Sequence, residues 1–384
     1  MLSIFVRTSV GDKPWGSELS YFELAESLSS YGVGIETLEN CSSRGIGSKV
    51  GRPRVRCLSE SGPWPIRLAR NSVSTIRIAR NVSPDLVLVP THYWVESLVL
   101  ARVACLILRK PLVMTLAGYY FPDEIPISSL MLRFNTRRNS LRSLLIAMAR
   151  RWAFHGVSLC LVPSRVMESY CRTHLRIENT VDIGRGVSEL WFQGTDQPKS
   201  FDAIFVGRLE KDKGAKSLPE IWKAVVRKKA DARLIVVGSG PLNREIKDLV
   251  GSYGLQDNVS FTGYLSDQRQ IRDLIRSSRL LLFPTRSEGF GRVVAEAMAC
   301  GVPCVVSDIP ALRELYEGFA TFVPPTDLSK FATEALALIT EEGTGENTNR
   351  RLVEHAKSFT WNGVAKKTIW AMRSILGDAP DQPS

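Results

Sequence analysis

Two carboxylates eight residues apart mark the stretch of the chain with the strongest chemical pattern. Glu288 precedes the turn Gly289-Phe290-Gly291, and Glu296 lies in the helix-forming run that follows it. Because this turn opens a helix, its unsatisfied N–H groups and the positive end of the helix dipole favour an anion such as a phosphate. A carboxylate beside the anion can accept hydrogen bonds from the hydroxyls of a sugar or ribose. A capped helix with two solvated glutamates is the alternative interpretation.

A second pattern is the charged stretch from Gly207 to Gly214, which reads Gly-Arg-Leu-Glu-Lys-Asp-Lys-Gly. Arg208 follows an apolar run, and Lys213 stands five residues later. A planar guanidinium and a mobile ammonium in these positions can converge on a diphosphate. A solvated loop of mixed charge is the alternative interpretation of this stretch.

These residues need a scaffold, and the chain alternates short apolar runs with helical patterns. Runs that are apolar on both faces are typical of parallel strands covered by helices. They predict an α/β protein of two doubly wound, Rossmann-like domains facing a central cleft. The expected strands are Ser3–Val6, Leu86–Val89, Leu112–Leu116 and Leu159–Val162 in the first half, and Ala203–Val206, Leu234–Val237, Leu280–Phe283 and Pro303–Ser307 in the second.

Two other segments are expected to be irregular. Residues 41–65 are rich in Ser, Arg, Gly and Pro, which predicts a long connection without regular structure. Gly, Thr, Asp, Gln and Pro cluster in Gly194–Ser200, which predicts the linker between the two domains. The sequence therefore places the domain boundary at residues 198/199.

Length and composition exclude a collagen, a coiled coil and a disordered tail as the main interpretation of the chain. At 384 residues, with 44% apolar and 23% charged residues, the chain fits a soluble globular protein of two domains. The formal net charge is +11, of which residues 1–200 carry +9 and the remainder +2. Nucleic acid, an anionic membrane or an anionic substrate could each account for this excess. No nucleic-acid-binding motif occurs, so we expect no nucleic-acid partner.

The expected location follows from cysteine usage and hydropathy. Seven cysteines without any Cys-x-x-Cys pair suit a reducing cytoplasm. No signal-peptide pattern is visible at the start, and the most apolar window, Leu98–Leu108, is too short to span a bilayer and contains Arg102. We therefore expect a cytoplasmic protein that is soluble or peripheral to the membrane.

Metal binding is not predicted. The chain contains no Asp-x-Asp motif, and its four histidines show no ligand spacing. The charge of a diphosphate would then be neutralised by Arg208, Lys213 and the helix N-terminus. We therefore expect no metal or other cofactor.

The segments around Glu288 and Arg208 resemble the motifs of glycosyltransferase family 4, which are retaining enzymes of the GT-B fold. The string EGFGRVVAEAMACGVPCVVSD is similar to the family's E-x7-E signature, and GRLEKDKG to its G-R-L-x-x-x-K-G motif. VGSGPL, VSFTGYLSD and FTWNGVAKKTIWAM match further segments in the family's order, so the resemblance is close over residues 200–375. In the first half, PWGSELSYFELAESLSSYG and GRGVSELWF are looser matches, and Ser188 stands where the family usually has Asp.

The resemblance implies a role for each matching position. Arg208 and Lys213 would bind the donor diphosphate, such as that of a UDP- or GDP-sugar, and stabilise the leaving group. Glu288 would bind hydroxyls of the donor sugar, and Glu296 would bind the ribose. The base would lie near Gly238 and Tyr264-Leu265. Backbone contacts to the donor would come from Gly16, Gly207, Gly289, Phe290 and Gly291.

The resemblance also implies how the domains divide the work. Residues 1–198 would bind the acceptor, residues 199–360 would bind the donor, and residues 361–384 would form a tail and a helix that returns to the first domain.

The sequence departs from the family pattern at one position of the sugar site. Family members often carry Thr-x-His after a strand of the first domain, whereas Ala117 occupies the His position here. His92, after the preceding strand, could partly replace it or could be an ordinary loop histidine. A nucleotide-sugar-binding protein with little turnover is therefore an alternative.

Two basic clusters suggest the nature of the acceptor. Residues 44–80 contain nine Lys and Arg against the single acid Glu60, and residues 133–151 contain six Arg and no acid. The second cluster is interleaved with aliphatic side chains, as in a basic amphipathic helix at a membrane surface. An ordinary helix with a solvated basic face is the alternative. We expect a glycan or glycolipid acceptor, attached to a membrane and used in making a surface polysaccharide, with a soluble acceptor as the alternative.

Overall fold

The structure is a computed structural model of the chain, and its description covers most of the sequence. By internal contacts the chain divides into two compact units. Unit 1 comprises Met1–Gly186 and Trp361–Ser384, and unit 2 comprises Val187–Thr360. The described residues are 3–9, 16–40, 54–58, 73–74, 76–78, 80–91, 95–116, 118, 148–149, 151–195, 197–340 and 346–378.

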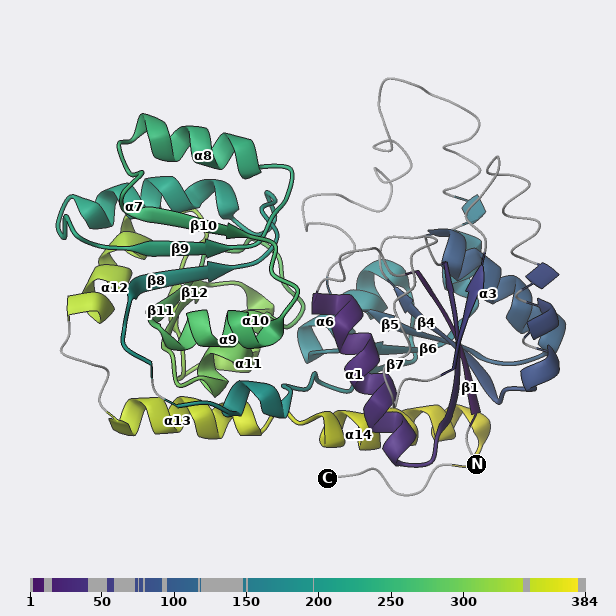
Figure 1. Cartoon of the computed structure of the whole chain (residues 1–384). Helices are drawn as coiled ribbons and strands as arrows, with labels where there is room; N and C mark the ends of the chain where they lie inside the picture. The colour runs from purple at the N-terminus through teal and green to yellow at the C-terminus, as the bar shows by residue number, and fades with distance from the viewer. Residues whose placement is uncertain are drawn as a thin grey trace. The chain divides into compact units, whose positions relative to one another are not determined.

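Unit 1 contains a sheet whose described strands are all parallel and run in the order β3-β2-β1-β4-β5-β6-β7 (Figure 1). Residues of β4, Leu86–Thr91, show why the strands are apolar on both sides. Val87 and Val89 join one buried cluster, and Leu86 and Leu88 join the other. Successive strand residues point to opposite faces, so helices must cover both. The other strands are β1 Ser3–Ser9, β2 Gly34–Asn40, β3 Arg54–Leu58, β5 Leu112–Leu116, β6 Val157–Val162 and β7 Thr180–Asp182.

The helices of unit 1 include one from the far end of the sequence. Helix α14, Trp361–Leu376, packs beside α1, Gly16–Ser30, where the Ser27 hydroxyl donates to the Trp361 carbonyl at 3.0 Å. Ala365, Ala371 and Met372 are buried in the same cluster as residues of α1. The C-terminal helix is therefore part of unit 1. Unit 1 also contains α3 Val95–Leu108, α6 Arg165–Tyr170 and a short π-helix, Cys171–Leu175.

Unit 2 repeats the same plan. Its described strands are parallel and run in the order β10-β9-β8-β11-β12-β13, with helices between consecutive strands (Figure 1). In both sheets the order reverses between the first and fourth strands, which is the doubly wound topology expected from the sequence. The strands are β8 Phe201–Val206, β9 Leu234–Val237, β10 Val259–Gly263, β11 Ser278–Phe283, β12 Cys304–Ser307 and β13 Thr321–Val323. The helices are α7 Leu218–Val226, α8 Asn243–Ser252, α9 Gln268–Arg276, α10 Arg292–Ala299, α11 Pro310–Tyr316, α12 Leu328–Thr340 and α13 Glu346–Lys357, with short 3₁₀ helices at Glu189–Phe192 and Ala215–Ser217.

The eight expected strands all form, and the structure adds β2, β3, β7, β10 and β13. Four of these five lie at the edges of their sheets. In β10, for example, buried and exposed residues mix, so its sequence lacks a continuous apolar run. One expectation was wrong: residues 41–65 are not irregular throughout, because β3 pairs with β2 there. The alternation of basic and apolar residues in Arg54-Val55-Arg56 fits an edge strand.

The boundary between the units also differs from the expected one. It falls between Gly186 and Val187 rather than at residues 198/199. Trp191 is buried in the core of unit 2, and its carbonyl accepts a hydrogen bond from Arg276 at 3.2 Å. Val187 pairs with Thr360 in a parallel bridge at the other end of the unit. A Gly- and Pro-rich composition alone therefore placed the linker too late.

Two glycines pack closely against each other in the loops that follow strands β8 and β9 of unit 2. Gly207 and Gly238 follow the neighbouring strands β8 and β9, and Gly238 has φ +133°. A β-carbon on Gly238 would overlap the carbonyl oxygen of Gly207. Only glycine combines this backbone conformation with so close an approach.

Gly238→Ala is expected to lower the free energy of unfolding by at least about 2–3 kcal/mol, since backbone strain and a backbone clash add. Gly254→Ala is the matched control, because Gly254 also has positive φ (+70°) but open space around it. It should cost only about 1–2 kcal/mol. Denaturant unfolding of both variants measures the difference. Equal losses would show that the close approach to Gly207 does not matter.

Candidate functional site

The predicted residues of the second half gather at one edge of unit 2's sheet. In a parallel sheet the carboxyl ends of all strands meet at the same edge, where ligands bind near the reversal of strand order. Here the reversal lies between β8 and β11. The structure brings to this edge Gly207, Arg208 and Lys213 after β8, Gly238 after β9, Tyr264 and Leu265 after β10, and Glu288, Gly289, Phe290 and Gly291 after β11.

An ion pair joins the two loops that flank the reversal. The Lys213 ammonium donates to Glu288 Oε1 at 2.7 Å, and the two side chains are only 17% and 15% exposed. Asp212 lies 3.6 Å from the same ammonium. Burial alone would lower the pKa of Lys213, but the carboxylates of Glu288 and Asp212 outweigh it and raise that pKa. The ammonium is therefore charged at neutral pH.

Backbone contacts hold these loops together. The N–H of Arg286 donates to the Asp212 carbonyl at 2.7 Å, and the Thr285 hydroxyl donates to the same oxygen at 3.0 Å. Gly214 has φ +66°, and a β-carbon there would overlap the carbonyl oxygen of Pro284. The loop after β8 is thus packed directly against the segment that follows β11. Lys213 meets Glu288 because the backbone brings them together.

Arg208 is compensated by acids of its own loop. Its guanidinium contacts Glu210 at 2.8 Å and Asp212 at 3.8 Å. Burial raises the pKa of Glu210, and the positive charge of Arg208 opposes that rise. The cluster therefore gathers two cations and several carboxylates in a partly buried place, where charges interact more strongly than in water.

The Gly-rich turn before α10 is held in place by a hydrogen bond and by aromatic packing. Gly291 is the N-cap of α10 with φ +75°, and the Tyr316 hydroxyl donates to its carbonyl at 3.4 Å. The Phe290 side chain is fully buried and packs edge-on against Tyr316 and Phe359. Only the backbone of Phe290 is left to contact a ligand. The turn thus presents its N–H groups from a rigid base.

Glu296 is held by a residue that the sequence analysis missed. The Arg292 guanidinium donates to Glu296 Oε1 through Nε at 3.0 Å and through Nη2 at 2.8 Å. Both side chains are nearly buried. Their spacing of four residues on a helix was a signal that could have identified the pair. The acids Glu210 and Asp212 were also missed as partners of the cations.

Several predicted residues remain untested. His92 and Ala117 lie outside the described residues, as do residues 133–147 and most of the segment 44–72. Gly16 begins helix α1 of unit 1. Within the described part of the chain, no group of three or more His, Cys, Asp or Glu side chains is placed to bind a metal ion. None of the described helices combines the length and apolar character needed to cross a membrane.

Comparison with known proteins decides the family. Residues 188–359 match the family described as glycosyl transferases group 1, and residues 16–188 match glycosyltransferase family 4. The chain belongs to glycosyltransferase family 4. The two matches together extend over nearly all of the chain and meet close to the boundary between the two units.

Individual relatives are more distant. Mannosylfructose-phosphate synthase of Agrobacterium fabrum is 30% identical over 43% of this chain and 39% of its own length. A GDP-mannose-dependent phosphatidylinositol dimannoside mannosyltransferase of Mycobacterium tuberculosis is 28% identical over 48% of each protein. Sucrose-phosphate synthase from Thermosynechococcus elongatus superposes with a TM-score of 0.78 over 98% of this chain and 100% of that chain, at 19% identity. The chain thus spans about half or less of these two curated relatives, and the structural match shows the GT-B fold.

Arg208→Ala and Lys213→Ala are each expected to weaken binding of a nucleoside diphosphate and to slow donor turnover about 10²–10³-fold, since each removes a cation from the partly buried cluster. Lys216→Ala is the matched control. Lys216 lies on the following 3₁₀ helix, is exposed and pairs with Glu245. Calorimetric titration with UDP and GDP measures the affinity. Wild-type affinity and turnover in both variants would contradict a diphosphate clamp at this site.

Proposed function

We propose that the protein transfers a sugar from a nucleotide-sugar to an acceptor hydroxyl, with retention of configuration at the anomeric carbon. The observation that carries this proposal is the ion pair between Lys213 and Glu288 across the strand reversal of unit 2. In this proposal the Lys213 ammonium binds the diphosphate and the Glu288 carboxylate beside it binds sugar hydroxyls. The N-terminus of α10 follows directly after Glu288 and can bind the same diphosphate.

When the donor binds, the charged side chains of the cluster exchange partners. The diphosphate takes the Lys213 ammonium from Glu288, and the sugar hydroxyls donate to the carboxylate that is released. Arg208 supplies a second cation to the diphosphate. Glu296 keeps one oxygen on Arg292 and offers the other to the ribose. Gly238 and Tyr264-Leu265 border the place of the base.

The reaction transfers the sugar without a protein nucleophile. The bond between the anomeric carbon and the diphosphate breaks, and its electron pair leaves with the diphosphate. The acceptor oxygen forms the new bond on the same face of the sugar, and its proton passes to the departing phosphate oxygen. Arg208, Lys213 and the N–H groups before α10 stabilise the negative charge that develops on the leaving group.

Substitutions of the two glutamates are expected to affect turnover and nucleotide binding differently. Glu288→Gln should slow donor hydrolysis or transfer by about 10²–10³-fold while sparing the binding of UDP or GDP, because the sugar-free nucleotide lacks the hydroxyls that Glu288 binds. Glu296→Ala should weaken binding of the free nucleotide and of the nucleotide-sugar alike, by about 10–100-fold, because the ribose is common to both. Titration calorimetry and a donor-hydrolysis assay separate these effects. If Glu288→Gln abolished binding of the free nucleotide, the role of Glu288 would be wrong.

We propose further that turnover needs no divalent metal, because two cations and a helix N-terminus already face the diphosphate and no Asp-x-Asp motif accompanies them. Turnover in excess EDTA should match that in Mg²⁺ or Mn²⁺. Loss of turnover in EDTA, with recovery on adding either ion, would overturn this part of the proposal.

The acceptor is proposed to be a lipid-linked or membrane-attached glycan of surface polysaccharide synthesis. The mannosyltransferase relative has a name that specifies a phosphatidylinositol-linked acceptor. In unit 1, four large apolar side chains on α3 and on the described residues before β6 are exposed: Leu106, Ile107, Met148 and Trp152. The Arg102 guanidinium lies 5.9 Å from the centre of the Trp152 ring.

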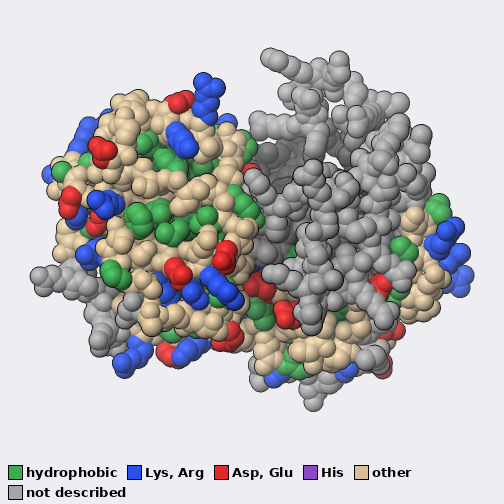
Figure 2. Space-filling model, in the orientation of Figure 1, with side chains coloured by type: hydrophobic (Ala, Val, Ile, Leu, Met, Phe, Trp, Pro, Cys, Tyr) green, Lys and Arg blue, Asp and Glu red, His purple; other side chains and the backbone are tan. Residues whose placement is uncertain are grey.

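The distribution of charge also supports a location at a membrane surface. Lys and Arg side chains gather at one edge of the described part of unit 1, whereas acidic and basic side chains mix over the visible face of unit 2 (Figure 2). An apolar surface beside basic residues suits the inner face of a cytoplasmic membrane, where each basic residue near anionic lipid contributes about 1 kcal/mol. A soluble acceptor is the alternative.

Vesicle co-sedimentation tests the membrane proposal. Binding should require phosphatidylglycerol in phosphatidylcholine vesicles and should fall as salt rises, because salt screens the attraction. It should drop when Arg133, Arg137, Arg138 and Arg142 become Gln, and also in the double variant Leu106→Ser, Trp152→Ser. Equal binding to neutral vesicles, or none to anionic ones, would leave a soluble acceptor as the better proposal.

A further inference from the structure

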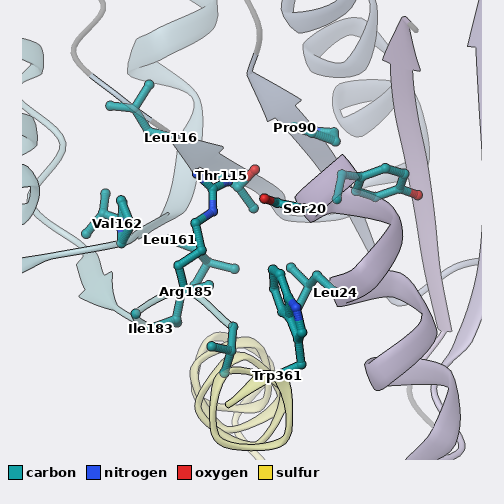
Figure 3. Close-up of a pocket in the computed structure, with 14 residues that line it drawn as sticks. Ser20, Leu24, Pro90, Thr115, Leu116, Leu161, Val162, Ile183, Arg185 and Trp361 are labelled. Carbon is teal, nitrogen blue, oxygen red and sulfur yellow. The ribbon is translucent and has the colours of Figure 1, made fainter. Parts of the chain in front are cut away.

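Unit 1 contains a pocket formed entirely by its own residues. The empty space between its described lining residues is about 450 Å³, counting the open solvent at its mouth. Pro90, Thr115-Leu116 and Leu161-Val162 line it at the carboxyl ends of β4, β5 and β6. Ser20, Tyr21 and Leu24 of α1 and the first turn of α14 form the other walls (Figure 3). The pocket thus lies at the edge of a parallel sheet where ligands bind in doubly wound folds.

Among the described residues that line this pocket, Arg185 carries the positive charge. Arg185, from the loop after β7, points across it toward Thr115 and Ser20 (Figure 3). Leu24, Leu161 and the ring of Trp361 make the surrounding wall largely apolar. A guanidinium surrounded by apolar side chains attracts an anion more strongly than one in water. Its planar fork can donate two parallel hydrogen bonds to a phosphate or carboxylate.

Hydrogen bonds hold the backbone turn that carries Arg185. The Ile183 N–H donates to the Val162 carbonyl at 2.9 Å, and the Gly184 N–H donates to Asp182 Oδ1 at 2.9 Å. On the other side, Gly186 lies so close to the Trp361 ring that a β-carbon there would overlap it. Arg185 therefore stands between two glycines in a tight turn. The turn also places the backbone next to Arg185 against the Trp361 ring.

We propose that this pocket binds an anionic group, a phosphate or a carboxylate, on the acceptor. Arg185 holds the anion, the hydroxyls of Thr115 and Ser20 offer further hydrogen bonds, and the Trp361 ring provides an apolar face for the attached sugar. The proposal rests on the proposed function for the word acceptor, but anion binding by the pocket stands on its own geometry. A guanidinium has five donors, so contacts with the protein leave capacity for a ligand.

The experiment uses the Trp361 indole as a local probe. Its N–H is buried and has no acceptor among the described residues, and Trp361→Phe identifies its NMR signal. The full chain, saturated with UDP to occupy the donor site, is titrated with glucose 6-phosphate and with monomeric dihexanoyl phosphatidic acid. Glucose serves as the phosphate-free control. Both phosphates carry the same anion, so the tighter binder shows whether a soluble or a lipid-linked phosphate is preferred.

At least one phosphate should shift the Trp361 signal in the wild type, and glucose should bind at least tenfold more weakly. Arg185→Gln should weaken the phosphate about 10–100-fold, with partial recovery in Arg185→Lys. Arg172→Gln is the matched control, because Arg172 lies on the surface of the same unit and pairs with Glu168. It should leave the titration unchanged.

Two outcomes would overturn the proposal: no phosphate-dependent shift of the Trp361 signal in the wild type, or equal phosphate affinity in the wild type and Arg185→Gln. Failure of the proposed function has a different signature. In that case the wild type would bind neither UDP nor GDP in calorimetry, whatever the Trp361 signal shows.

Discussion

The candidate site depends on one interaction, the ion pair between Lys213 and Glu288. The two residues lie 75 positions apart in sequence and come from loops after strands that are neighbours only because the strand order reverses between them. A partly buried cation without a partner would be costly, and so would a partly buried carboxylate. Each makes the other tolerable in the unliganded protein. The same pair holds two groups ready for a ligand that carries both an anion and hydroxyls.

The aromatic side chains beneath the site extend this constraint. Phe290 packs against Phe359, and Phe359 also packs against His355, whose ring stacks on Phe319 at 3.8 Å between centroids. Burial lowers the pKa of His355, so the ring remains neutral at physiological pH. The Phe359 carbonyl accepts a hydrogen bond from Val187 at 2.9 Å. This aromatic cluster thus supports both the Gly-rich turn and the two ends of unit 2.

The sequence predicted what local patterns determine. Apolar runs such as Leu112–Leu116 marked the central strands, because those strands are buried on both faces. The spacing of Glu288 and Glu296 indicated the turn and helix that carry them. Neither the contact of Lys213 with Glu288 nor the compensation of Arg208 by Glu210 and Asp212 could be read from spacing, because both depend on how loops fold back. Edge strand β3 was missed because residues 41–65 have the composition of a loop, and the boundary at Val187 was missed because the linker-like composition lies later, at Gly194–Ser200. The roles of His92 and Ala117 remain predictions.

The division of the chain has a consequence for its synthesis. Unit 2 is one continuous segment, and its first and last residues, Val187 and Thr360, pair side by side. It can therefore complete its core as soon as residue 360 has left the ribosome. Unit 1 cannot, because Val364, Ala365 and Met372 of α14 complete the core on one face of its sheet. The half of the protein that is translated first is thus the half that finishes folding last. Until α14 docks, the apolar residues of α1 and β6 that it covers remain open to other chains.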